Sequence, residues 1–468
     1  MTTMARLPSA TGLAFDPALV RKYDGFGPRY TSYPTADRFD ERFGPEDYVR
    51  NLSARAGAGP QPLSLYVHLP FCSTICYYCA CNKVITGDHG RSAKYIRYLG
   101  REIAMVSALV ESAAPVEQLH WGGGTPTFLA PEEMWVLMSM LRDAFAFALD
   151  AEISIEVDPR KVGAETIAAL ASLGFNRISV GIQDFDPVVQ RAVNRIQGEA
   201  ETRAVMDAAR VNGFVSVNVD LIYGLPRQTL AGFAATLDKV VAAAPDRIAL
   251  YSYAHVPHLF KPQRRIEVRD FPSAETKLGI LALAIDRLGA TGYRYIGTDH
   301  FATPTDELAR AQDAGGLQRN FQGYSTRPEC DLLAFGVSAI GKVGPSYVQN
   351  VRTLDEYYAR LDTQTLPVLR GITLDADDLL RRDVIQRLMC RFALDYAAVE
   401  SAHRIKFGDY FGPELAALET LAADGLIEWV EGGLTVTPRG RMLVRSVAIV
   451  FDRHLREQRD SARYSRVI

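Results

Sequence analysis

The sequence has few cysteines and no long apolar run, and both shortages narrow what the protein can be. Only six cysteines occur in 468 residues, too few for a small disulfide-stapled secreted domain. No stretch reaches the ~18 uninterrupted apolar residues of a membrane-spanning helix. Residues 1–20 also lack the continuous apolar segment of a signal peptide. We therefore expect a cytoplasmic protein without membrane insertion.

An excess of charge of either sign is also missing. The chain has 52 lysines and arginines against 55 acidic residues, and its sequence pI is about 6.3. Overall electrostatics therefore give no reason to expect nucleic-acid binding. At this length the chain can bury a substantial core and form two or three structural units.

The scarce cysteines are clustered, because four of them follow an alternating apolar run over Leu63–Leu69 that predicts a β-strand. They are Cys72, Cys76, Cys79 and Cys81. A disulfide framework is disfavoured because Cys330 and Cys390 lie far away. A structural zinc site normally draws its ligands as two separated pairs. Soft thiolates packed this closely favour an iron–sulfur cluster.

A pattern of strand, loop and helix repeats about six times from residue 63. It predicts an α/β fold, a partial (β/α)6 TIM-like barrel that is open on one side. The expected strands are Leu63–Leu69, Gln118–Trp121, Glu152–Val157, Arg177–Ile182, Ser216–Ile222 and Arg247–Tyr253. The expected helices are Lys94–Val110, Pro131–Phe145, Ala164–Leu173, Ala200–Asn212, Gln228–Ala243 and Ala274–Leu288. Functional residues should lie at the carboxyl ends of the strands.

The rest of the chain predicts two further units. Residues 1–55 are expected to form an arm, mobile over residues 1–22, with the gating segment RYTSYPT. The barrel with its extension should span 56–370, where the βα rhythm fades past residue 290 apart from a short helix from Asp306. Residues 371–468 predict a mostly helical, winged-helix-like domain that covers the open side of the barrel. Its helices are expected at Ala376–Phe392 and Pro413–Asp424, before a hairpin through Gly432-Gly433.

Glycines and polar residues at the expected strand ends point to one shared pocket. The run WGGGTPT, residues 121–127, lets backbone groups approach a ligand without a Cβ in the way. Glu156 either accepts ribose hydroxyls or forms a surface salt bridge. Arg195 is either a solvated cation at a helix end or, as we favour, a carboxylate or cofactor partner. His68 and His120 are more typical of satisfied core residues than of ligands.

Motifs along almost the whole chain, from Tyr23 to Ile468, carry a resemblance. The spacing Cys-x3-Cys-x2-Cys resembles the signature of the radical S-adenosylmethionine (SAM) superfamily. The chain resembles, within it, the oxygen-independent coproporphyrinogen III oxidases, also called coproporphyrinogen dehydrogenases, of haem biosynthesis. The motifs are RYTSYPT, YVHLPFCxxxCYYCxCNK, HWGGGTPT, ISIEVDPR, GIQDF, VNR, NVDLIYGLP, DHFA, NFQGY and SRVI. The chain departs from the family at Ala80, where a glycine is expected, and at Tyr78, which replaces a Phe.

The resemblance implies one [4Fe-4S] cluster and two SAM molecules. The implied cluster ligands are Cys72, Cys76 and Cys79. The implied contacts of the first SAM are Tyr66, Gly123, Glu156 and Ile340. Those of the second SAM are Tyr78, Gly124, Thr125, Gln183, Arg195, Asp220 and Ala254. The candidates nearest to the chemistry are Tyr66, Glu156, Arg195 and Cys81, where Cys81 is either a spare thiol beside the substrate or merely buried.

The resemblance also implies the reaction. A 5′-deoxyadenosyl radical removes a hydrogen from a propionate β-carbon of coproporphyrinogen III, and loss of CO2 and of one electron leaves a vinyl group. Two propionates react to give protoporphyrinogen IX, with an external electron donor and acceptor. The tetra-anionic macrocycle calls for cations and an apolar floor. The candidates are Arg29, Arg195 and Arg319 with Tyr30, Tyr33 and Phe321, and Gln322 is expected near SAM. We expect a monomer.

Two other functions within the same superfamily stay open at this point. One is a haem-binding chaperone that keeps the three cysteines without this oxidase activity, and the other is a haem-acting methyltransferase. Cys81, Arg195 and the long C-terminal unit favour the oxidase.

Overall fold

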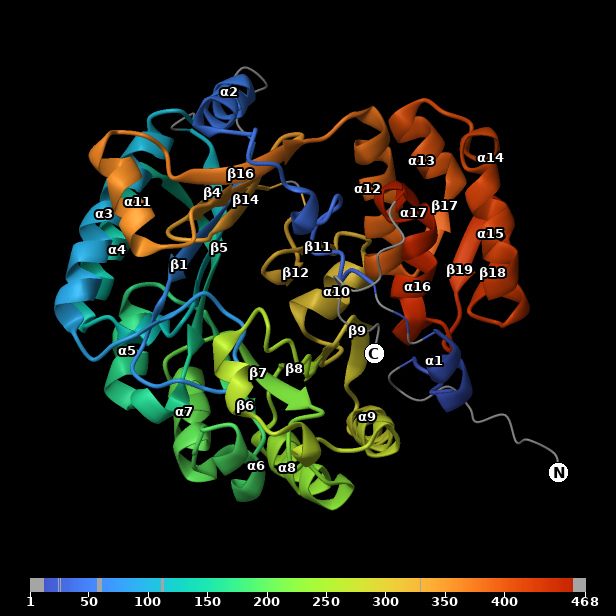
Figure 1. Ribbon diagram of the computed structural model, residues 1–468, viewed down its shortest axis with the longest axis horizontal. Coiled ribbons are helices and arrows are strands. Elements are labelled where there is room, and N and C mark those ends of the chain that lie inside the picture. Colours follow the sequence, from blue (N-terminus) through green and yellow to red (C-terminus); the bar gives the residue numbers. More distant parts are fainter. Residues whose placement is uncertain are drawn as a thin grey trace.

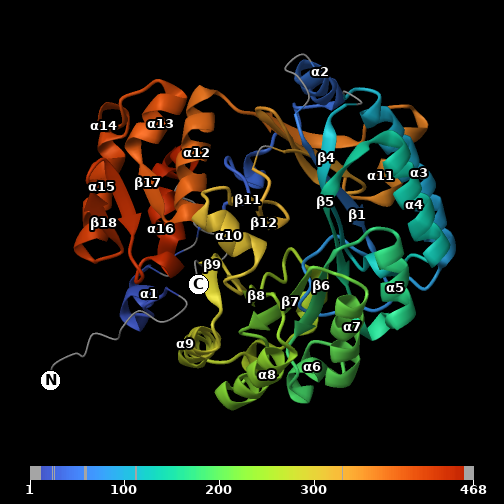
Figure 2. The same cartoon turned by 180° about the vertical axis from the view of Figure 1, so that it is seen from behind.

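The computed structural model describes residues 12–23, 25, 27–56, 61–110, 113–328 and 330–457. Residues 1–11 of the expected arm and the motif SRVI, residues 465–468, lie outside these ranges. One sheet of twelve strands dominates the fold, in the order β16-β15-β14-β13-β1-β4-β5-β6-β7-β8-β10-β9. It curves into the wall of a barrel, with helices on its outer face (Figures 1 and 2).

Six parallel strands in the middle of the sheet confirm the predicted partial barrel. They are β1 (Leu63–Leu69), β4 (Pro115–Gly123), β5 (Ala146–Val157), β6 (Arg177–Gln183), β7 (Ser216–Tyr223) and β8 (Arg247–Ser252). The alternating helices are α3 (His89–Ser107), α4 (Pro131–Ala144), α5 (Ala164–Ser172), α7 (Glu199–Val211), α8 (Leu230–Ala243) and α9 (Ala274–Ala290). No helix in the described ranges is long and apolar enough to cross a bilayer.

Capping residues set the helix starts that apolar periodicity does not locate. The α3 helix begins at His89, not at the predicted Lys94, because the Asp88 side chain accepts a hydrogen bond from the Gly90 amide. The α8 helix begins at Leu230 because Thr229 caps it in the same way. Periodicity therefore finds the body of a helix, and the cap fixes its first turn.

The sheet extends beyond the six strands at both ends, and this was missed in the sequence. At one end β13 (Asp331–Phe335) pairs in parallel with β1, and β14 (Ile340–Val343), β15 (Ser346–Asn350) and β16 (Val368–Thr373) continue it antiparallel. At the other end lie β10 (His300–Ala302) and β9 (Arg294–Gly297). All residues of β13 and β15 are buried, so neither strand shows the alternation that marks a half-buried strand.

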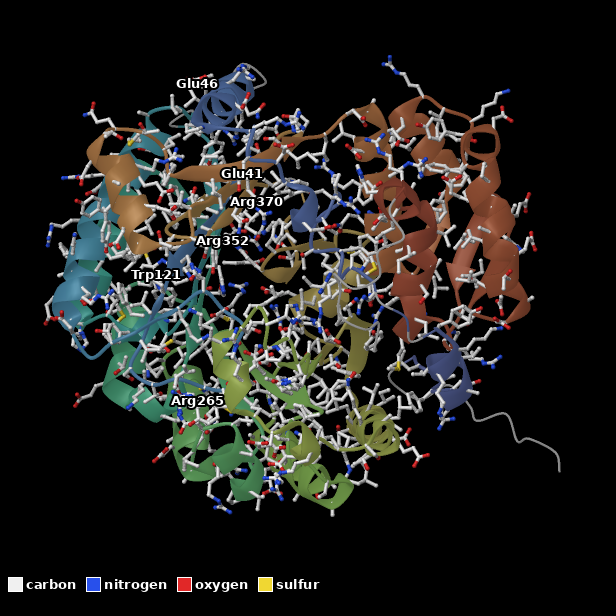
Figure 3. All side chains as sticks on the ribbon, viewed as in Figure 1. Glu41, Glu46, Trp121, Arg265, Arg352 and Arg370 are labelled. Carbon is white, nitrogen blue, oxygen red and sulfur yellow. The ribbon has the colours of Figure 1, made fainter. Side chains whose placement is uncertain are left out.

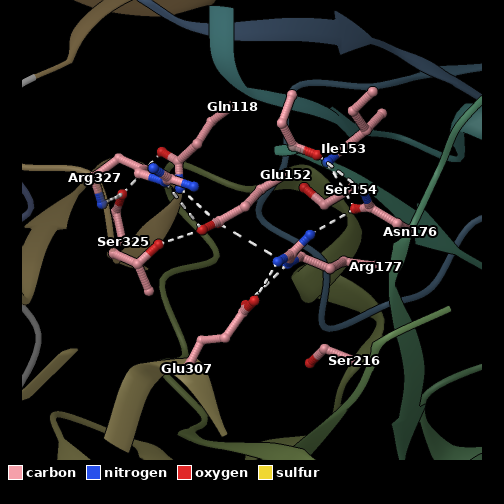
Figure 4. Close-up of polar contacts among 12 residues, drawn as sticks. Gln118, Glu152, Ile153, Ser154, Asn176, Arg177, Ser216, Glu307, Ser325 and Arg327 are labelled. Carbon is pink, nitrogen blue, oxygen red and sulfur yellow. Dashed lines mark hydrogen bonds and ion pairs between the residues drawn. The ribbon is translucent and has the colours of Figure 1, made fainter. Parts of the chain in front are cut away.

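A network of ion pairs closes the amino end of the barrel (Figure 4). Glu152 at the centre accepts a hydrogen bond from Gln118 and faces the guanidinium groups of Arg177 and Arg327. Arg177 also pairs with Glu307 of the α10 helix (Glu307–Asp313), which begins after Asp306 as predicted. These ion pairs lie at the end opposite the carboxyl ends of the strands, where the barrel rule places the functional site.

The C-terminal unit combines helices with a small antiparallel sheet, β17-β19-β18. Its elements are α12 (Ala376–Arg391), β17 (Ala393–Asp395), α13 (Tyr396–His403), α14 (Phe407–Tyr410), α15 (Gly412–Ala423), β18 (Ile427–Val430), β19 (Gly433–Val436), α16 (Val444–Ala448) and α17 (Arg453–Glu457). The hairpin turns through Glu431-Gly432, because Val430 already pairs with Gly433, which corrects the predicted Gly432-Gly433 turn. The α12 helix packs against α10, β9 and a hairpin of β11 (Gln318–Asn320) and β12 (Gly323–Ser325).

The N-terminal segment lies against this C-terminal unit rather than extending away from it. The α1 helix (Pro17–Tyr23) is fixed by Lys22 and Tyr23, which both contact Asp424. The expectation of a mobile arm is therefore wrong for this helix, which is shorter than the patterns that periodicity detects. In RYTSYPT, the Tyr30 hydroxyl donates to Asp452 (3.0 Å) and the Tyr33 hydroxyl accepts from the Arg453 amide (3.2 Å).

The remaining N-terminal residues return to the barrel. The α2 helix (Pro45–Ala56) contacts β14, and Asp40 forms an isolated bridge with Gly371 of β16. The expected domain boundaries at 55/56 and 370/371 therefore fall inside α2 and β16. Figure 3 shows Glu41, Arg352 and Arg370 gathered at this junction, well away from Arg265 at the opposite side of the barrel. The α11 helix (Leu354–Asp362) lies beside α3.

Candidate active site

The cysteine loop leaves the carboxyl end of β1 and folds over the barrel mouth. The short strand β2 (Phe71–Cys72) pairs in parallel with β3 (Val84–Ile85), which closes the loop between them. Cys76 is buried, Cys72 and Cys79 are partly exposed, and Cys81 is exposed. All four thiols line one cavity of about 170 Å³. The loop therefore presents the clustered cysteines to a single space, as the spacing predicts.

The glycine run forms the support beneath this loop. Gly123 has a φ of +114°, and a Cβ there would lie 2.6 Å from His68 Cε1. A Cβ on Gly124 would lie 2.6 Å from the backbone carbon and oxygen of Pro70. The amides of Gly124 and Thr125 donate to the carbonyls of Leu69 and Phe71, both at 2.8 Å. Only residues without a side chain allow the two backbone segments to lie this close.

Two arginines lie beside the Cys76 sulfur. Arg195 is 7 % exposed, and its Nη2 donates to the Gly181 carbonyl at 2.8 Å. Its guanidinium also faces Asp158, as does that of Arg160, whose Nη2 lies 2.6 Å from Asp158 Oδ2. Each arginine brings one nitrogen to 3.7 Å from Cys76 Sγ. Arg195 is thus a buried carboxylate partner, and the alternative of a solvated helix-end cation is wrong.

Asp158 and Arg160 were missed in the sequence. The signal for them was the run Asp158-Pro159-Arg160 directly after the carboxyl end of β5, where the barrel rule places functional residues. The two residues form a short 3-10 turn in which Asp158 also accepts from the Arg160 amide. Together with Arg195 they place two positive charges and one negative charge beside the thiols.

Two carboxyl groups, on β5 and β7 with β6 between these strands, have opposite pKa shifts. Burial on its own raises the pKa of Glu156. Hydrogen bonds from His120 and from the Gly123 amide, together with the electrostatic effect of His120, outweigh burial and hold the Glu156 pKa below its ordinary value. Burial and the nearby Glu156 charge raise the pKa of Asp220 to about 6, against hydrogen bonds from Ser179 and Asn218. The site therefore holds an ionised carboxylate next to one that protonates near neutral pH.

A second cavity of about 370 Å³ adjoins the first and shares Cys81, Gly123 and Glu156 with it. Tyr66 and His68 lie on its wall, with the Tyr66 hydroxyl 3.0 Å from His68 Nδ1. Because His68 Nε2 lies 3.0 Å from the Asn82 carbonyl, which only accepts, Nε2 carries the proton and Nδ1 accepts from Tyr66. This hydrogen bond fixes the orientation of the tyrosine.

The structure divides the predicted site residues between the two cavities. The first cavity collects the following: Cys72, Cys76, Tyr78, Cys79, Cys81, Gly123, Gly124, Thr125, Glu156, Gln183, Arg195 and Asp220. The second adds Tyr66 and Ile340, with Phe321 and Gln322. Ala254 lines neither cavity, and its carbonyl accepts from Gln263 at 3.2 Å.

The predicted substrate cations and tyrosines do not form one surface. Tyr30 and Tyr33 are 1 % and 0 % exposed because their rings and hydroxyls are packed against the C-terminal unit. Arg29 pairs with Asp299 at 2.7 Å, and Arg195 lies beside the thiols. Of the three arginines, Arg319 lines a further, larger cavity that Phe321 also lines. The expectation that the tyrosines form a substrate floor is therefore wrong.

The thiols do not converge on a single point. Among the described residues, no group of three His, Cys, Asp or Glu side chains is placed to hold one metal ion. A mononuclear zinc site requires such convergence. An iron–sulfur cluster does not, because its thiolate ligands bind separate iron atoms.

Comparison with known proteins identifies both parts of the fold. The sequence model of the radical SAM superfamily matches residues 66–240. That of the HemN C-terminal domain matches residues 374–443. The first therefore covers the cysteine loop and five barrel strands, and the second covers most of the winged-helix-like unit.

Whole-length relatives agree with these matches. The chain is 51% identical to the oxygen-independent coproporphyrinogen III oxidase of Pseudomonas aeruginosa, over 97% of this chain and 99% of the relative. It is 48% identical to the protein of that name from Escherichia coli, over 98% and 100%. The solved structure described as "Coproporphyrinogen III oxidase (HemN) from Escherichia coli is a Radical SAM enzyme" superposes with a TM-score of 0.90 at 47% identity, covering 95% of this chain and 100% of that one. The chain therefore belongs to the oxygen-independent coproporphyrinogen III oxidase family of the radical SAM superfamily.

Proposed function

We propose that the protein converts coproporphyrinogen III to protoporphyrinogen IX without oxygen, as a radical SAM oxidoreductase of haem biosynthesis. One observation carries the proposal: the thiols, the glycine run and the polar strand ends meet in one cavity at the barrel mouth of a chain that matches this family over its full length. The chaperone and methyltransferase alternatives lack comparable support, since the full-length relatives share the oxidase name.

The donor set fits the cofactors of the superfamily, a [4Fe-4S] cluster and SAM. We propose Cys72, Cys76 and Cys79 as the cluster ligands, because all three line the cavity and soft thiolates suit iron. Arg160 and Arg195 beside Cys76 compensate the negative charge of bound thiolates. Cys81 lies at the junction of the two cavities, which supports a position beside the reacting groups rather than a role as ligand.

Two adjoining cavities support the proposal of two SAM molecules. The residues assigned to the first SAM, Tyr66, Gly123, Glu156 and Ile340, all line the 370 Å³ cavity. Those assigned to the second, apart from Ala254, all line the 170 Å³ cavity. Gly123 and Glu156 line both cavities, so the two proposed sites meet at these residues. Equilibrium dialysis with labelled SAM should find two molecules per cluster, and one per cluster would refute it.

When bound, the cluster and SAM supply the electron and the radical that removes a hydrogen from the propionate β-carbon. The chain positions the reacting groups and excludes water, for which the buried barrel mouth is suited. The carboxylate then leaves as CO2 and one electron passes to an external acceptor, so that each propionate becomes a vinyl group. No strong acid or base is needed, and Glu156 serves instead to accept hydrogen bonds from the cofactor.

The test is anaerobic. Protein reconstituted with iron and sulfide, then given reductant, SAM and coproporphyrinogen III, should form protoporphyrinogen IX and 5′-deoxyadenosine. Omitting SAM is the matched control and should abolish both products. Stoichiometric haem binding without SAM cleavage would contradict the proposal and favour a chaperone.

Organisation and location follow as further parts of the proposal. We propose that the protein acts as a cytoplasmic monomer and receives electrons from an external donor. We also propose that the barrel unit ends with β16 and that the C-terminal unit begins at α12, between residues 373 and 376. Size-exclusion chromatography with light scattering tests the monomer, for which a dimer mass is the contradicting result.

A further inference from the structure

A cavity of about 740 Å³ lies between the barrel and the C-terminal unit. It is bounded by α12, by the β11–β12 hairpin and by the sheet around β13 and β14. Its volume falls within the range of roughly 300–1,000 Å³ usual for ligand pockets, whereas the cavities beside the thiols measure about 170 and 370 Å³. Of these three spaces it is the one large enough for most of a tetrapyrrole.

The described wall of this cavity is strongly cationic. It contains Arg319, Arg327, Lys342, Arg382, Arg387 and Arg391, against a single acidic residue, Asp383. Asp383 is already engaged, because Arg387 and His403 contact it at 2.8 and 3.1 Å. Arg327 is likewise engaged by carboxylates on β4 and β5.

Three of these cations, Arg319, Arg382 and Arg391, make no ion pair with any residue in the described part of the chain. Arg319 is 4 % exposed, and its Nε donates to the Arg29 carbonyl while its Nη1 finds no acceptor. The buried Nη1 of Arg382 also has no hydrogen-bond partner. Buried guanidinium nitrogens without acceptors are costly, and an anion would satisfy them.

The cavity also borders the active site. Phe321 lines both this cavity and the 370 Å³ cavity that contains Tyr66 and Glu156. Its ring packs edge-on against Tyr347, at a centroid distance of 6.0 Å, and Tyr347 lines the large cavity as well. An aromatic surface next to unpaired guanidinium groups matches a flat apolar ring system that carries carboxylates.

We propose that this cavity binds the propionates of the porphyrinogen, with Arg319, Arg382 and Arg391 as carboxylate partners and Phe321 between the cavity and the reacting centre. The C-terminal unit thereby forms part of the substrate site, since Arg382 and Arg391 belong to α12. Propionates that are not reacting are held on α12 while another reaches the barrel mouth. The identity of the ligand rests on the proposed function, but the carboxylate chemistry does not.

The test measures binding separately from turnover. Coproporphyrin III, the oxidised macrocycle with the same four propionates, is titrated into reconstituted wild type, Arg382→Gln, Arg391→Gln and the double variant. We expect about tenfold weaker binding for Arg382→Gln and a larger loss for the double variant, because charged hydrogen bonds to carboxylates are lost. The KM for coproporphyrinogen III should rise with kcat and iron content nearly unchanged.

Arg97→Gln is the matched control, because Arg97 is exposed on α3 and makes no ion pair among the described residues. Binding by the double variant that equals this control would overturn the proposal. If Arg382→Gln unfolds at lower temperature than wild type, Arg391→Gln at the exposed end of α12 decides the outcome. Wild type that binds coproporphyrin III without converting the porphyrinogen would refute the proposed function while leaving this site intact.

Discussion

Gly124→Ala is the substitution whose effect the structure defines most closely. The added Cβ would lie 2.6 Å from the carbon and the oxygen of the Pro70 carbonyl and 2.8 Å from the Phe71 oxygen. These are backbone atoms, so no side-chain rotation relieves the contact. An ordinary contact begins at 3.4 Å, and the segment before Cys72 must therefore move by about 0.8 Å. That movement opposes the hydrogen bond from the Gly124 amide to Leu69.

This displacement should lower both the stability of the protein and its turnover. Overpacking of a close-packed site reduces the free energy of unfolding by about 1–3 kcal/mol. Displacement of a reacting group by ~1 Å lowers turnover by up to about 10²-fold, so we expect the variant to lose about 10- to 100-fold in kcat/KM. Anaerobic reconstitution followed by iron analysis and a 5′-deoxyadenosine assay measures both the loading of the loop and its alignment.

Gly408→Ala is the control, because a Cβ on Gly408 meets nothing within 4 Å and the residue lies in α14, remote from the thiols. We expect this variant to match wild type in iron content and turnover. If Gly124→Ala also bound wild-type iron and turned over at the wild-type rate, the close approach of the glycine run to the cysteine loop would not be needed for function.

Three further predictions concern single side chains. Cys79→Ser should lose the cluster, whereas Cys81→Ser should retain its iron and its visible absorption, and loss of iron from both would show that the ligands are wrongly assigned. Arg195→Ala should keep the cluster but lose about 10- to 100-fold in kcat/KM, since a charged hydrogen bond contributes about 1.5–3 kcal/mol; unchanged turnover would leave it a purely structural cation. Burial raises the pKa of Glu102 from 4.5 to about 7. Between these two pH values the folded state therefore binds one more proton than the unfolded state. The free energy of unfolding should fall as the pH rises from 4.5 to about 7, and level off above it. Thermal unfolding at pH 5 to 8 should show this decline in wild type and not in Glu102→Gln, and equal slopes would contradict it.

The sequence predicts the central strands well because most of them are short apolar runs between turn signals, whereas β5 begins at Ala146, six residues before its predicted start. It misses β13, although this strand pairs with β1 at Leu63 and Asp331. Every residue of β13 is buried, so its pattern does not distinguish a strand from a buried helical segment. Its partner also lies far away in the sequence, and no local signal records such a pairing.

The residues of the candidate site also differ in how far the sequence predicts them. The cysteines and glycines are predictable because their spacing within one loop already carries the chemistry. The contact of Arg195 with Asp158 joins residues that are 37 positions apart, from the loop after α6 and the end of β5, so no local pattern records it. The large cationic cavity is harder still to predict, because its arginines come from the hairpin after α10 and from α12, and neither segment looks unusually basic alone.

The contacts of RYTSYPT with Asp452 and Arg453 also determine the order in which the parts of the chain can fold during synthesis. Tyr30 and its partner Asp452 are separated by 422 positions, so the ribosome makes the first long before the second. During that interval the cysteine loop and the six parallel strands are complete while the N-terminal segment has no partner. The N-terminal segment therefore docks only when residues 445–453 emerge, after the barrel strands and the cysteine loop have been made. A chain halted before residue 445 should leave this segment open to protease.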